Sequence, residues 1–486
     1  MRASSGIGFL CGRNTCRTGP DRTEPELLRE RRRRSATIGA VMVLASGAVW
    51  QASAQEDAPA AGDAAAEGTE IDFDAMFDEE IIEEPETSIS DAEGDGATEL
   101  VDPLQAAEVR WGGRFDFGLD GAWRWDRYED VGTAAADSET LAADAAATLF
   151  FDARASETFR VFGKAKVDYV PDPDDPAGEA FLFDTQIFEL FSDFQWGDWV
   201  FFRAGKQRAD WGVGRFFSPA DLISLVTIDP NEPDAEREGP VAVKAQAPIG
   251  VHNSYLYLLT DALQEPLDLG AAARAEVVVG SVEIGFGGVL QDALVPKGIV
   301  TATAALGDFD LFGELLIQRG TERNLITEPG TLPADVVAAE DRDDWFLSAT
   351  VGATYLTTDP NLIVTAQYYY NPLGYPDSEL RDEALALSLL LPDPPIVPLD
   401  ILFFGTHYAA AAVSWSDIAD TDLSTSVSWV GNLSDGSGTV SPSLRWRLLD
   451  EVVASVGGAI GYGEAPDETV ESVSLTASLS LGSGGF

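Results

Sequence analysis

The sequence predicts an all-β fold: a transmembrane, antiparallel, up-and-down β-barrel of about 18 strands (16–18), preceded by a signal peptide and a disordered acidic segment. Three observations predict it. Segments that alternate apolar and polar residues recur after residue 108, short turns and longer loops alternate between them, and a basic block followed by an apolar stretch lies near the N-terminus, from residue 29 to residue 50. The expected domains are an export segment (1–54), an acidic periplasmic tether (55–107) and the barrel (108–486).

The N-terminal segment has the order of a secretory signal. A basic block at Arg29 and 31–34 precedes an apolar run from Ala36 to Trp50 and the small residues of 52–54. Cleavage is expected between Ala54 and Gln55. The run is about 15 residues long, which is short for a membrane-spanning helix of roughly 20 residues. A buried core helix is the alternative interpretation.

Residues 55–107 carry 18 acidic residues and neither Lys nor Arg. Such a composition cannot bury enough apolar surface to order itself, so the segment is expected to be a disordered, solvated tether. Within it, 71–78 interleaves acids with apolar residues, and Ile81 and Ile82 follow. This stretch is alternatively a short linear motif that docks a periplasmic partner.

Charge and cysteine content exclude several functions. The chain has 31 basic and 82 acidic residues, a net charge of −51, which disfavours binding to nucleic acid. Both cysteines, Cys11 and Cys16, precede the expected cleavage site, so the mature chain would have no thiol for catalysis, zinc binding or disulfides. The two histidines, His252 and His407, are far apart in sequence and are expected to be structural.

Residues 109–125 give the clearest strand. Val109, Trp111, Phe115 and their alternate successors lie on one face, and charged or small residues lie on the other. A tilted strand crosses a bilayer in about 9–11 residues, so this strand should extend beyond the lipid. Aromatic residues at both ends of the apolar face are typical of interfacial girdles.

The same pattern predicts the remaining strands. They are expected at 139–155, 158–170, 183–196, 199–208, 240–247, 251–260, 270–279, 282–291, 298–306, 309–320, 343–357, 361–371, 403–415, 421–431, 438–447, 452–462 and 470–481. Short turns alternate with mostly longer loops, as in outer-membrane barrels, and an even strand count places both termini on the periplasmic side. A soluble β-sandwich or propeller is the alternative for many short strands.

One stretch resembles a known assembly signal, and another resembles a known family. Phe486 ends the chain after an alternating strand and resembles the signal read by the bacterial outer-membrane assembly machinery, although four Gly and Ser residues intervene. Residues 203–221 resemble a segment of Gram-negative porin-like barrels, among them alginate-export-like porins. The resemblance covers about 20 residues and implies the class of barrel but no solute. The matched residues are Gly205, Lys206, Gln207, Trp211, Gly212, Pro219 and Asp221.

The longest early loop, 209–239, is the candidate constriction. An external loop this rich in apolar residues would be poorly solvated if it pointed outward, so we expect it to fold into the lumen. The alternative is packing across the mouth or against a trimer neighbour. Calcium binding by its acids is a weaker expectation, because the spacing is not that of an EF-hand. The candidate residues are Trp211, Phe216, Phe217, Asp221, Asp229, Glu232, Asp234, Glu236 and Glu238.

Basic residues concentrate in the first strands, on the face expected to line the lumen. This predicts a basic wall opposite the acids of the loop; pairing with local aspartates into a neutral network is the equal alternative. The residues are Arg110, Arg114, Arg124, Arg154, Arg160, Lys164, Lys166 and Arg203. A further loop, 372–402, has leucines at helical spacing and is expected to be a lid or a packing element.

These observations favour a channel of the bacterial outer membrane for passive or facilitated diffusion of small hydrophilic solutes. The alternative is a structural barrel that presents loops and anchors a periplasmic partner; an outer-membrane hydrolase is a weak third, since no nucleophile elbow, P-loop or His-Glu-x-x-His motif occurs. No resident cofactor or metal is expected. The expected partners are outer-membrane lipid and lipopolysaccharide, the assembly machinery and, in a homotrimer, further copies.

Overall fold

The structure is a computed structural model of the chain. It describes residues 108–156, 158–171, 181–197, 199–233, 235–260, 270–291, 294–321, 324–328, 337–340, 343–358, 360–376, 405–449, 452–463 and 472–485. All of them belong to one compact unit, Trp50–Phe486. The predicted export segment, the tether, the cleavage residues Ala54 and Gln55, and Phe486 lie outside the described residues.

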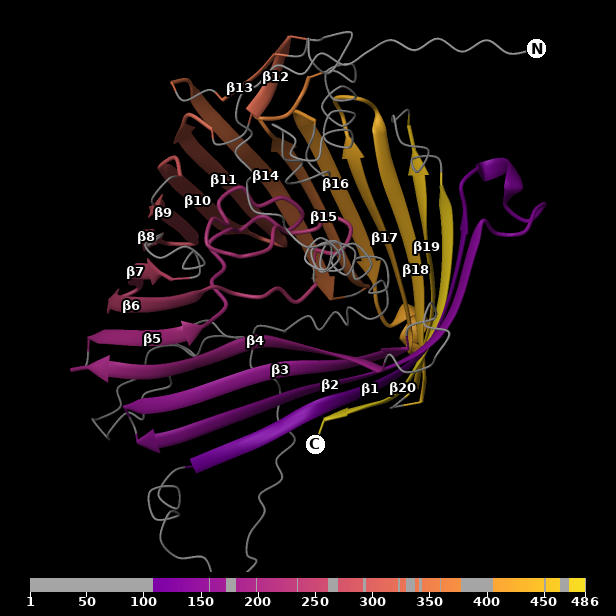
Figure 1. Cartoon of the computed structure of the whole chain (residues 1–486), viewed down its shortest axis with the longest axis horizontal. Coiled ribbons are helices and arrows are strands. Elements are labelled where there is room, and N and C mark those ends of the chain that lie inside the picture. Colours follow the sequence, from indigo (N-terminus) through magenta and orange to yellow (C-terminus); the bar gives the residue numbers. More distant parts are fainter. Residues whose placement is uncertain are drawn as a thin grey trace, which may run out of the picture. The chain divides into compact units, whose positions relative to one another are not determined.

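The chain is built almost entirely of β-strands (Figure 1). Single 3-10 turns occur at Tyr128–Asp130 and Ile418–Asp420. The strands are β1 (Glu108–Trp125), β2 (Ser138–Ser156), β3 (Phe159–Pro171), β4 (Phe181–Trp196), β5 (Val200–Lys206), β6 (Val241–Ile249), β7 (His252–Leu259), β8 (Gly270–Val279), β9 (Val282–Gln291), β10 (Lys297–Leu306), β11 (Phe309–Arg319), β12 (Asn324–Glu328), β13 (Val337–Glu340), β14 (Trp345–Thr358), β15 (Asn361–Tyr370), β16 (His407–Trp415), β17 (Leu423–Asn432), β18 (Ser437–Leu449), β19 (Val452–Tyr462) and β20 (Val473–Gly485).

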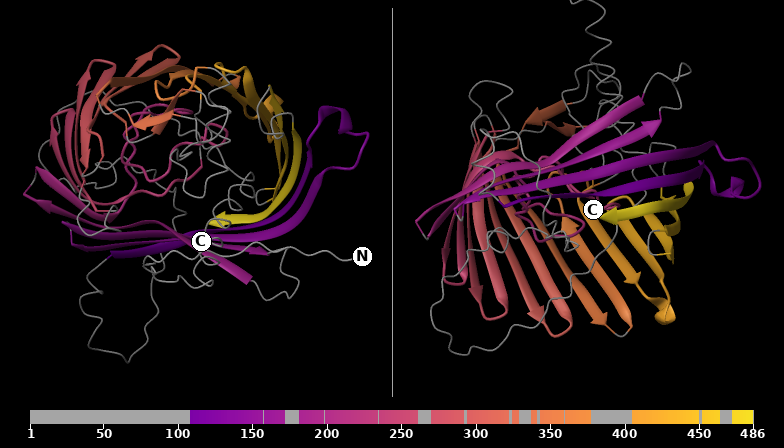
Figure 2. Two further views of the ribbon diagram at one scale, coloured as in Figure 1. Left: turned by 45° about the horizontal axis from the view of Figure 1, so that its top comes forward. Right: turned by 90° about the horizontal axis from the view of Figure 1, so that it is seen from below.

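Eighteen of these strands form one closed antiparallel barrel. Each pairs with the strand before and after it, and β1 closes the ring by pairing with both β2 and β20 (Figure 2). Closure removes the unpaired edges that an open sheet would expose. The predicted barrel class and the strand count of 18 are confirmed.

The predicted strands agree with the observed ones, and the bounds of β8, β9 and β19 are identical to those expected. Short turns do alternate with longer connections; several turn where a glycine takes a left-handed conformation, such as Gly250 at φ 64° and Gly280 at φ 65°. One expectation was wrong: the predicted strands leave 321–342 as a loop between 309–320 and 343–357, but β12 and β13 pair there as a separate hairpin. Most of the 372–402 loop, from residue 377, lies outside the described residues.

The outward face of the barrel is apolar. Many large hydrophobic side chains are exposed on it, and tryptophans are among the most exposed, as with Trp111 at 70%, Trp196 at 69% and Trp345 at 71%. Such a surface is poorly solvated in water but fits lipid, with tryptophan suited to the interface. No helix in the described residues is long and apolar enough to cross a membrane.

The segment between β5 and β6 positions the candidate site. It leaves the wall after Lys206, runs inside the ring of strands and rejoins the wall at Val241 (Figure 1). Its residues contribute several of the most buried side chains of the described chain, including Trp211, Phe216 and Phe217. The barrel therefore has an inner packing layer made by its own loop.

Candidate functional site: the barrel lumen

The inward loop is held from across the lumen by one carboxylate. Glu314, on the inner face of β11, is 4% exposed. It accepts hydrogen bonds from the backbone N–H groups of Val213, Gly214 and Ala220, the last at 2.9 Å, and from the Ser218 hydroxyl at 3.0 Å. Hydrogen bonds to a buried ionised acceptor are stronger than neutral ones. Glu314 thus fixes the backbone of residues 213–220.

A buried amide holds the next residues of the loop. Gln367 on β15 accepts from the backbone N–H groups of Arg215 and Phe216 at 3.1 and 2.8 Å. Its own amide group donates to the Phe217 carbonyl at 2.6 Å. From β8, Arg274 donates to the carbonyl of Trp211. Three distant strands therefore pin one short stretch of backbone.

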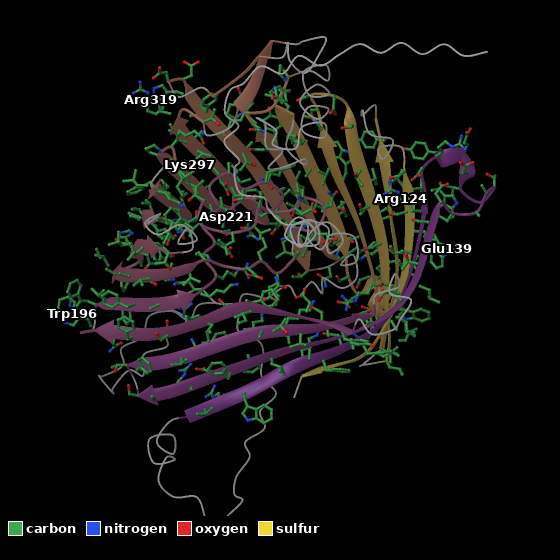
Figure 3. The ribbon with its side chains drawn as sticks, in the orientation of Figure 1. Arg124, Glu139, Trp196, Asp221, Lys297 and Arg319 are labelled. Atoms are coloured by element: carbon green, nitrogen blue, oxygen red, sulfur yellow. The ribbon has the colours of Figure 1, made fainter. Side chains whose placement is uncertain are left out.

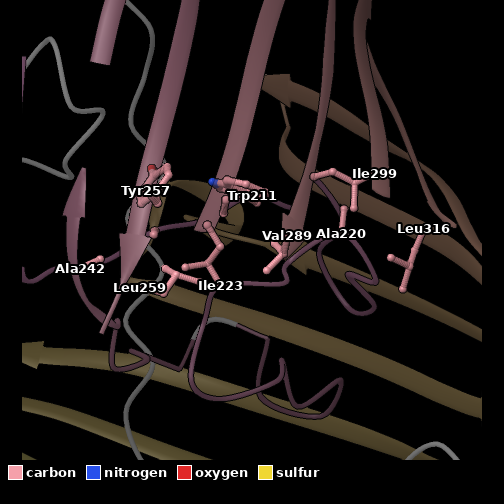
Figure 4. Packing of buried hydrophobic residues seen from close by; sticks show 11 residues of the cluster. Trp211, Ala220, Ile223, Ala242, Tyr257, Leu259, Val289, Ile299 and Leu316 are labelled. Carbon is pink, nitrogen blue, oxygen red and sulfur yellow. The ribbon is translucent and has the colours of Figure 1, made fainter. Parts of the chain in front are cut away.

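Apolar packing secures the same stretch. Trp211, Ala220 and Ile223 pack on inward-facing side chains of β6 to β11, among them Tyr257 and Leu316 (Figure 4). The Trp211 and Tyr257 ring centroids lie 5.6 Å apart, edge to face. On another part of the wall, a second cluster joins Phe216 and Phe217 to Tyr408 and Ala410 of β16.

Burial, more than ion pairing, accounts for the inward position. Fully burying a large apolar side chain contributes roughly 1.5–3 kcal/mol, and Trp211, Phe216 and Phe217 are each at most 2% exposed. An exposed ion pair contributes about 0–1 kcal/mol. The inner face of β6–β11 carries apolar residues that match the loop, which explains why the loop packs there.

The porin-like motif begins at a close approach of two strands. Gly205 has φ 134°, and a Cβ there would lie 2.2 Å from the carbonyl oxygen of Leu190 on β4. Only glycine fits such a backbone. Lys206 pairs with Glu238, and the buried Gln207 amide donates to the Ala242 carbonyl at 2.9 Å. These residues fasten both ends of the loop to each other.

The rest of the motif shapes the loop's interior. A Cβ on Gly212 would lie 1.6 Å from the Ser218 hydroxyl, so this glycine lets the loop fold over Glu314. Pro219 is the second residue of a single turn, 218–221, in which the Asp221 N–H donates to the Ser218 carbonyl at 3.2 Å. Asp221, inside the ring in Figure 3, accepts from Arg237 at 2.6 Å and from Ser224 at 2.7 Å. The matched residues therefore have structural roles in the loop.

The acids of the loop's second half have different surroundings. Glu236 pairs with Lys164 of β3 at 2.6 Å, and Glu238 pairs with Lys206, so these two face the basic strands. Asp229 caps its own turn by accepting from the Asn231 N–H at 2.9 Å. Glu232 makes no such contact with the described wall. Asp234 lies outside the described residues.

Burial changes the acidity of the loop's carboxyls. Burial raises the pKa of Asp221 above its ordinary value, against the opposing charge and hydrogen bond of Arg237. Burial and the nearby Asp229 raise the pKa of Glu232. For Glu238 burial acts in the same direction, but the hydrogen bonds from Lys206 and Gln186 and the Lys206 charge outweigh it and lower its pKa.

Residues of the predicted basic wall are engaged in ion pairs. Three of them pair with an acid two residues further along the same strand face: Arg114 with Asp116 at 3.1 Å, Arg124 with Asp126 at 3.1 Å, and Lys166 with Asp168 at 3.0 Å. Arg110 lies exposed near the start of β1 and also has an interaction partner. This arrangement is that of a neutral network along strands β1–β3.

The remaining basic residues converge on two buried aspartates. Asp193 on β4 is fully buried and accepts two hydrogen bonds from Arg203 at 2.8 and 3.0 Å. Arg160 lies 3.8 Å from Asp193 and 2.9 Å from Asp152, which Arg154 also approaches at 3.5 Å. Buried arginines with such partners serve mainly to compensate charge. A role of these residues in conduction stays a prediction.

The wall of β17 to β20 is different, because small hydroxyl side chains line its inner face. The Ser426 and Ser443 hydroxyls bond each other at 2.7 Å, and Ser455 and Ser478 do so on the next strand pair. Outward positions carry apolar residues such as Leu444, 45% exposed. Among the described apolar clusters, the one that contains Phe216 and Phe217 reaches this wall at Val430 of β17, and no residue of β18 to β20 belongs to either cluster.

Two arginines stand out on this serine-lined wall. Arg445 and Arg447 alternate with the outward Leu444 and Trp446 on β18. Within the described chain, neither side chain has a hydrogen-bond or ion-pair partner. The two arginines lie two residues apart on one face of β18, and Asp422 lies opposite Arg447 on the β17 side, where its carbonyl accepts the Arg447 N–H at 3.1 Å.

The sequence reasoning missed the residues that hold the loop and the two unpaired arginines. Glu314 and Gln367 occupy inward positions of alternating strands, where a lone polar residue among apolar ones was an available signal. Arg445 and Arg447 flank a tryptophan in an alternating strand, a pattern that placed them inward. No feature of the sequence indicated that Arg274 of β8 would donate a hydrogen bond to the backbone of the loop.

The histidines and acids form no reactive group in the described residues. His252 accepts the Val278 N–H at 3.1 Å, and His407 is 2.7 Å from the Tyr368 hydroxyl on another part of the wall. Among these residues, no group of three or more His, Cys, Asp or Glu side chains is placed to hold a metal ion.

Comparisons with known proteins find similarity in fold. No protein-family model matches the chain, and no curated protein matches it. Among solved structures, OccK8 (OprE) of Pseudomonas aeruginosa is 7% identical over 77% of this chain and 98% of its own, with a TM-score of 0.46. OccAB1 of Acinetobacter baumannii is 11% identical over 77% and 96%, with a TM-score of 0.45. A loop-deletion mutant of OmpT, an outer membrane protein of Vibrio cholerae, is 10% identical over 78% and 100%, with a TM-score of 0.37.

Proposed function

We propose that this protein is a bacterial outer-membrane channel for passive or facilitated diffusion of small hydrophilic solutes, with the 209–239 loop as its constriction. One observation carries the proposal: the barrel closes with 18 strands, and its loop packs on the β6–β11 and β15–β16 side. Barrels of 16–18 strands enclose more space than wall side chains fill. The serine-lined wall then offers the polar path.

The chemistry of this path favours small polar solutes. Serine hydroxyls can replace water around a solute that donates or accepts hydrogen bonds, whereas an apolar solute gains nothing from them. No catalytic step and no cofactor are needed for such passage. We place the barrel in the outer membrane with both termini periplasmic; lipopolysaccharide, the assembly machinery and trimer partners belong to the same proposal.

Single-channel recording of the purified mature chain tests the proposal. The parent should give discrete conductance steps in planar bilayers. Deleting residues 213–236 should raise the conductance, because this removes the packed stretch and leaves the strands intact. Heat-modifiable migration in gels should verify that each variant is a folded barrel. Folded protein with no conductance steps in either form would refute the channel.

The packing of the loop also favours a second candidate. A loop that fills the lumen completely would make a plugged barrel that serves as an anchor or surface protein. The parent would then be silent, and only the loop-deleted barrel would conduct. This result separates the two candidates in one experiment.

A further inference from the structure

The two halves of the inward loop are held in the barrel by different kinds of contact. Residues 211–223 are held by apolar packing and by the buried Glu314. Residues 231–238, which we call the return segment, lead back to the wall at β6. None of the described side chains of the return segment belongs to the two apolar clusters. Its contacts with the wall are made by charged side chains.

Two glutamates of the return segment reach the wall of β3–β5. Glu236 pairs with Lys164 of β3 at 2.6 Å, and Glu238 pairs with Lys206, the last residue of β5. Glu238 also accepts a hydrogen bond from Gln186 of β4. The four paired side chains are 20–38% exposed, so ions in solution can reach them. Salt weakens the attraction between such partly exposed charges more than it weakens buried contacts.

A second carboxylate lies beside Lys164. Glu189 of β4 is directly opposite Lys164 in the strand pairing, and its carboxylate accepts the Arg208 N–H at 3.2 Å. Opposite charges at directly paired positions stabilise a strand pair. When Glu236 leaves, Lys164 therefore stays next to a carboxylate, and this lowers the cost of separating the return segment from the wall.

One ion pair joins the return segment to the first half of the loop. Arg237 lies 2.6 Å from Asp221 and 3.3 Å from Asp210. The Asp221 side chain is 5% exposed, so this pair is the one best protected from salt. The return segment can therefore leave the wall of β3–β5 and still remain attached to the first half of the loop.

We propose that the Lys164–Glu236 and Lys206–Glu238 pairs form a salt-sensitive latch. At low ionic strength the latch holds the return segment against β3–β5. At high ionic strength the segment leaves that wall, while residues 211–223 keep their place. The consequence for transport rests on the function proposed above: the constriction is narrower in dilute medium than in salt. The latch itself requires only the folded barrel.

Spin-label mobility tests the latch without relying on conduction. The label is placed at Ala235→Cys, an exposed position next to Glu236, in the chain 55–486, which has no other cysteine. Spectra are compared at about 0.01 M and 1 M salt, where the screening lengths are about 30 and 3 Å. The ratio of mobile to immobile label should rise about tenfold in 1 M salt, or about 1.4 kcal/mol, which two partly exposed ion pairs can supply. A label at Val213→Cys, where the backbone is bonded to Glu314, should not respond.

Neutralising the two lysines should open the latch without salt. Lys164→Gln with Lys206→Gln should make the Ala235 label mobile at both salt concentrations. The matched control is Lys166→Gln with Lys297→Gln, which makes the same change in net charge on β3 and β10, since Lys166 pairs with Asp168 of its own strand. This control should keep the salt response of the parent.

Three outcomes would overturn the latch. They are a parent whose Ala235 label ignores salt, a Val213 label that responds as strongly as the Ala235 label, and a lysine variant that behaves like its control. The second outcome would mean that the loop moves as one body. If the lysine variant does not give the heat-modifiable folded form, Glu236→Gln with Glu238→Gln breaks the same pairs from the loop side and decides in its place.

A conductance measurement separates this inference from the proposed function. At low salt the Lys164 and Lys206 variant should conduct more than its control, and the two should become alike at 1 M salt. A folded parent with a salt-responsive Ala235 label but no conductance steps would support the latch and refute the channel. A conducting parent whose label does not respond to salt would refute the latch and leave the channel standing.

Discussion

The inward loop should be released by removing one negative charge on the opposite wall. Glu314→Gln keeps the shape of the side chain but leaves one acceptor oxygen where the carboxylate had two. One oxygen of Glu314 serves the N–H groups of Val213 and Gly214, and the other serves Ala220. Whichever way the amide is oriented, its NH2 group meets a backbone donor.

The cost follows from these contacts. A hydrogen bond to a charged group contributes about 1.5–3 kcal/mol, and a buried donor left unpaired costs a further 1–3 kcal/mol or so. Because such terms are not additive, we take about 3 kcal/mol in total. This corresponds to on the order of a hundredfold more displaced loop at equilibrium.

Native-state proteolysis measures this population directly. Trypsin can cut the loop after Arg215 only when the segment leaves the lumen, because Phe216 and Phe217 are buried. When opening and closing are fast, the cleavage rate follows the open population. We expect cleavage of Glu314→Gln on the order of a hundredfold faster than the parent, with noisier and larger conductance.

The control lies on the same strand. Asp310→Asn makes the same chemical change on β11 at an exposed position, and cleavage should not change. A Glu314→Gln variant cleaved within about threefold of the parent would refute the reasoning, since about 0.7 kcal/mol would then be the whole effect. The loop would be held by its apolar clusters alone.

Three further predictions concern pH, charge and space. Acidification from pH 7 toward 4.5 should not release the loop. The raised pKa of Asp221 lets the folded protein bind a proton above the ordinary value of 3.8, so the contribution of Asp221 to the free energy of unfolding grows as the pH falls, while the lowered pKa of Glu238 keeps its ion pair with Lys206 until below pH 4.5. Tryptic cleavage at each pH checks this, and Asp221→Asn should remove the pH dependence that Asp221 contributes. Arg160→Glu places a third carboxylate beside the buried Asp152 and Asp193, which should lower the stability by about 3–5 kcal/mol and abolish the heat-modifiable folded form. Arg114→Glu, at a side chain that is 46% exposed, should still fold and should shift selectivity toward cations at low salt. Gly212→Ala, with a Cβ 1.6 Å from a side-chain oxygen, should cost about 1–3 kcal/mol and raise tryptic cleavage of the loop; unchanged cleavage would mean that the backbone relaxes freely.

The barrel could be predicted from sequence because its signals are local. Alternation of apolar and polar residues marks each strand, and a glycine or an Asp-containing turn marks each short connection. The barrel then follows from pairing each strand with the next one in the sequence. The β12–β13 hairpin was missed because its two short strands lack a sustained face. The inward loop was predicted from its aromatic residues, which had no other place to be buried.

The partners inside the lumen could not be predicted in the same way. Lys164 pairs with Glu236, and Glu314 binds residues about a hundred positions away, so their contacts depend on how strands and loop meet in space. Sequence alone left a basic wall and a neutral network equally open. Only the register of strands shows that Arg160 and Arg203 share one buried aspartate.

The two sides of the lumen differ in the side chains that line them and in whether the loop packs on them. The wall of β6–β11 uses inward apolar residues and Glu314 to hold the loop, so it is occupied by protein. The wall of β17–β20 carries serine residues on its inner face, together with Arg445 and Arg447 of β18. Because the other side is covered by the loop, we expect selectivity to respond to these two arginines more than to the paired basic residues of β1–β5.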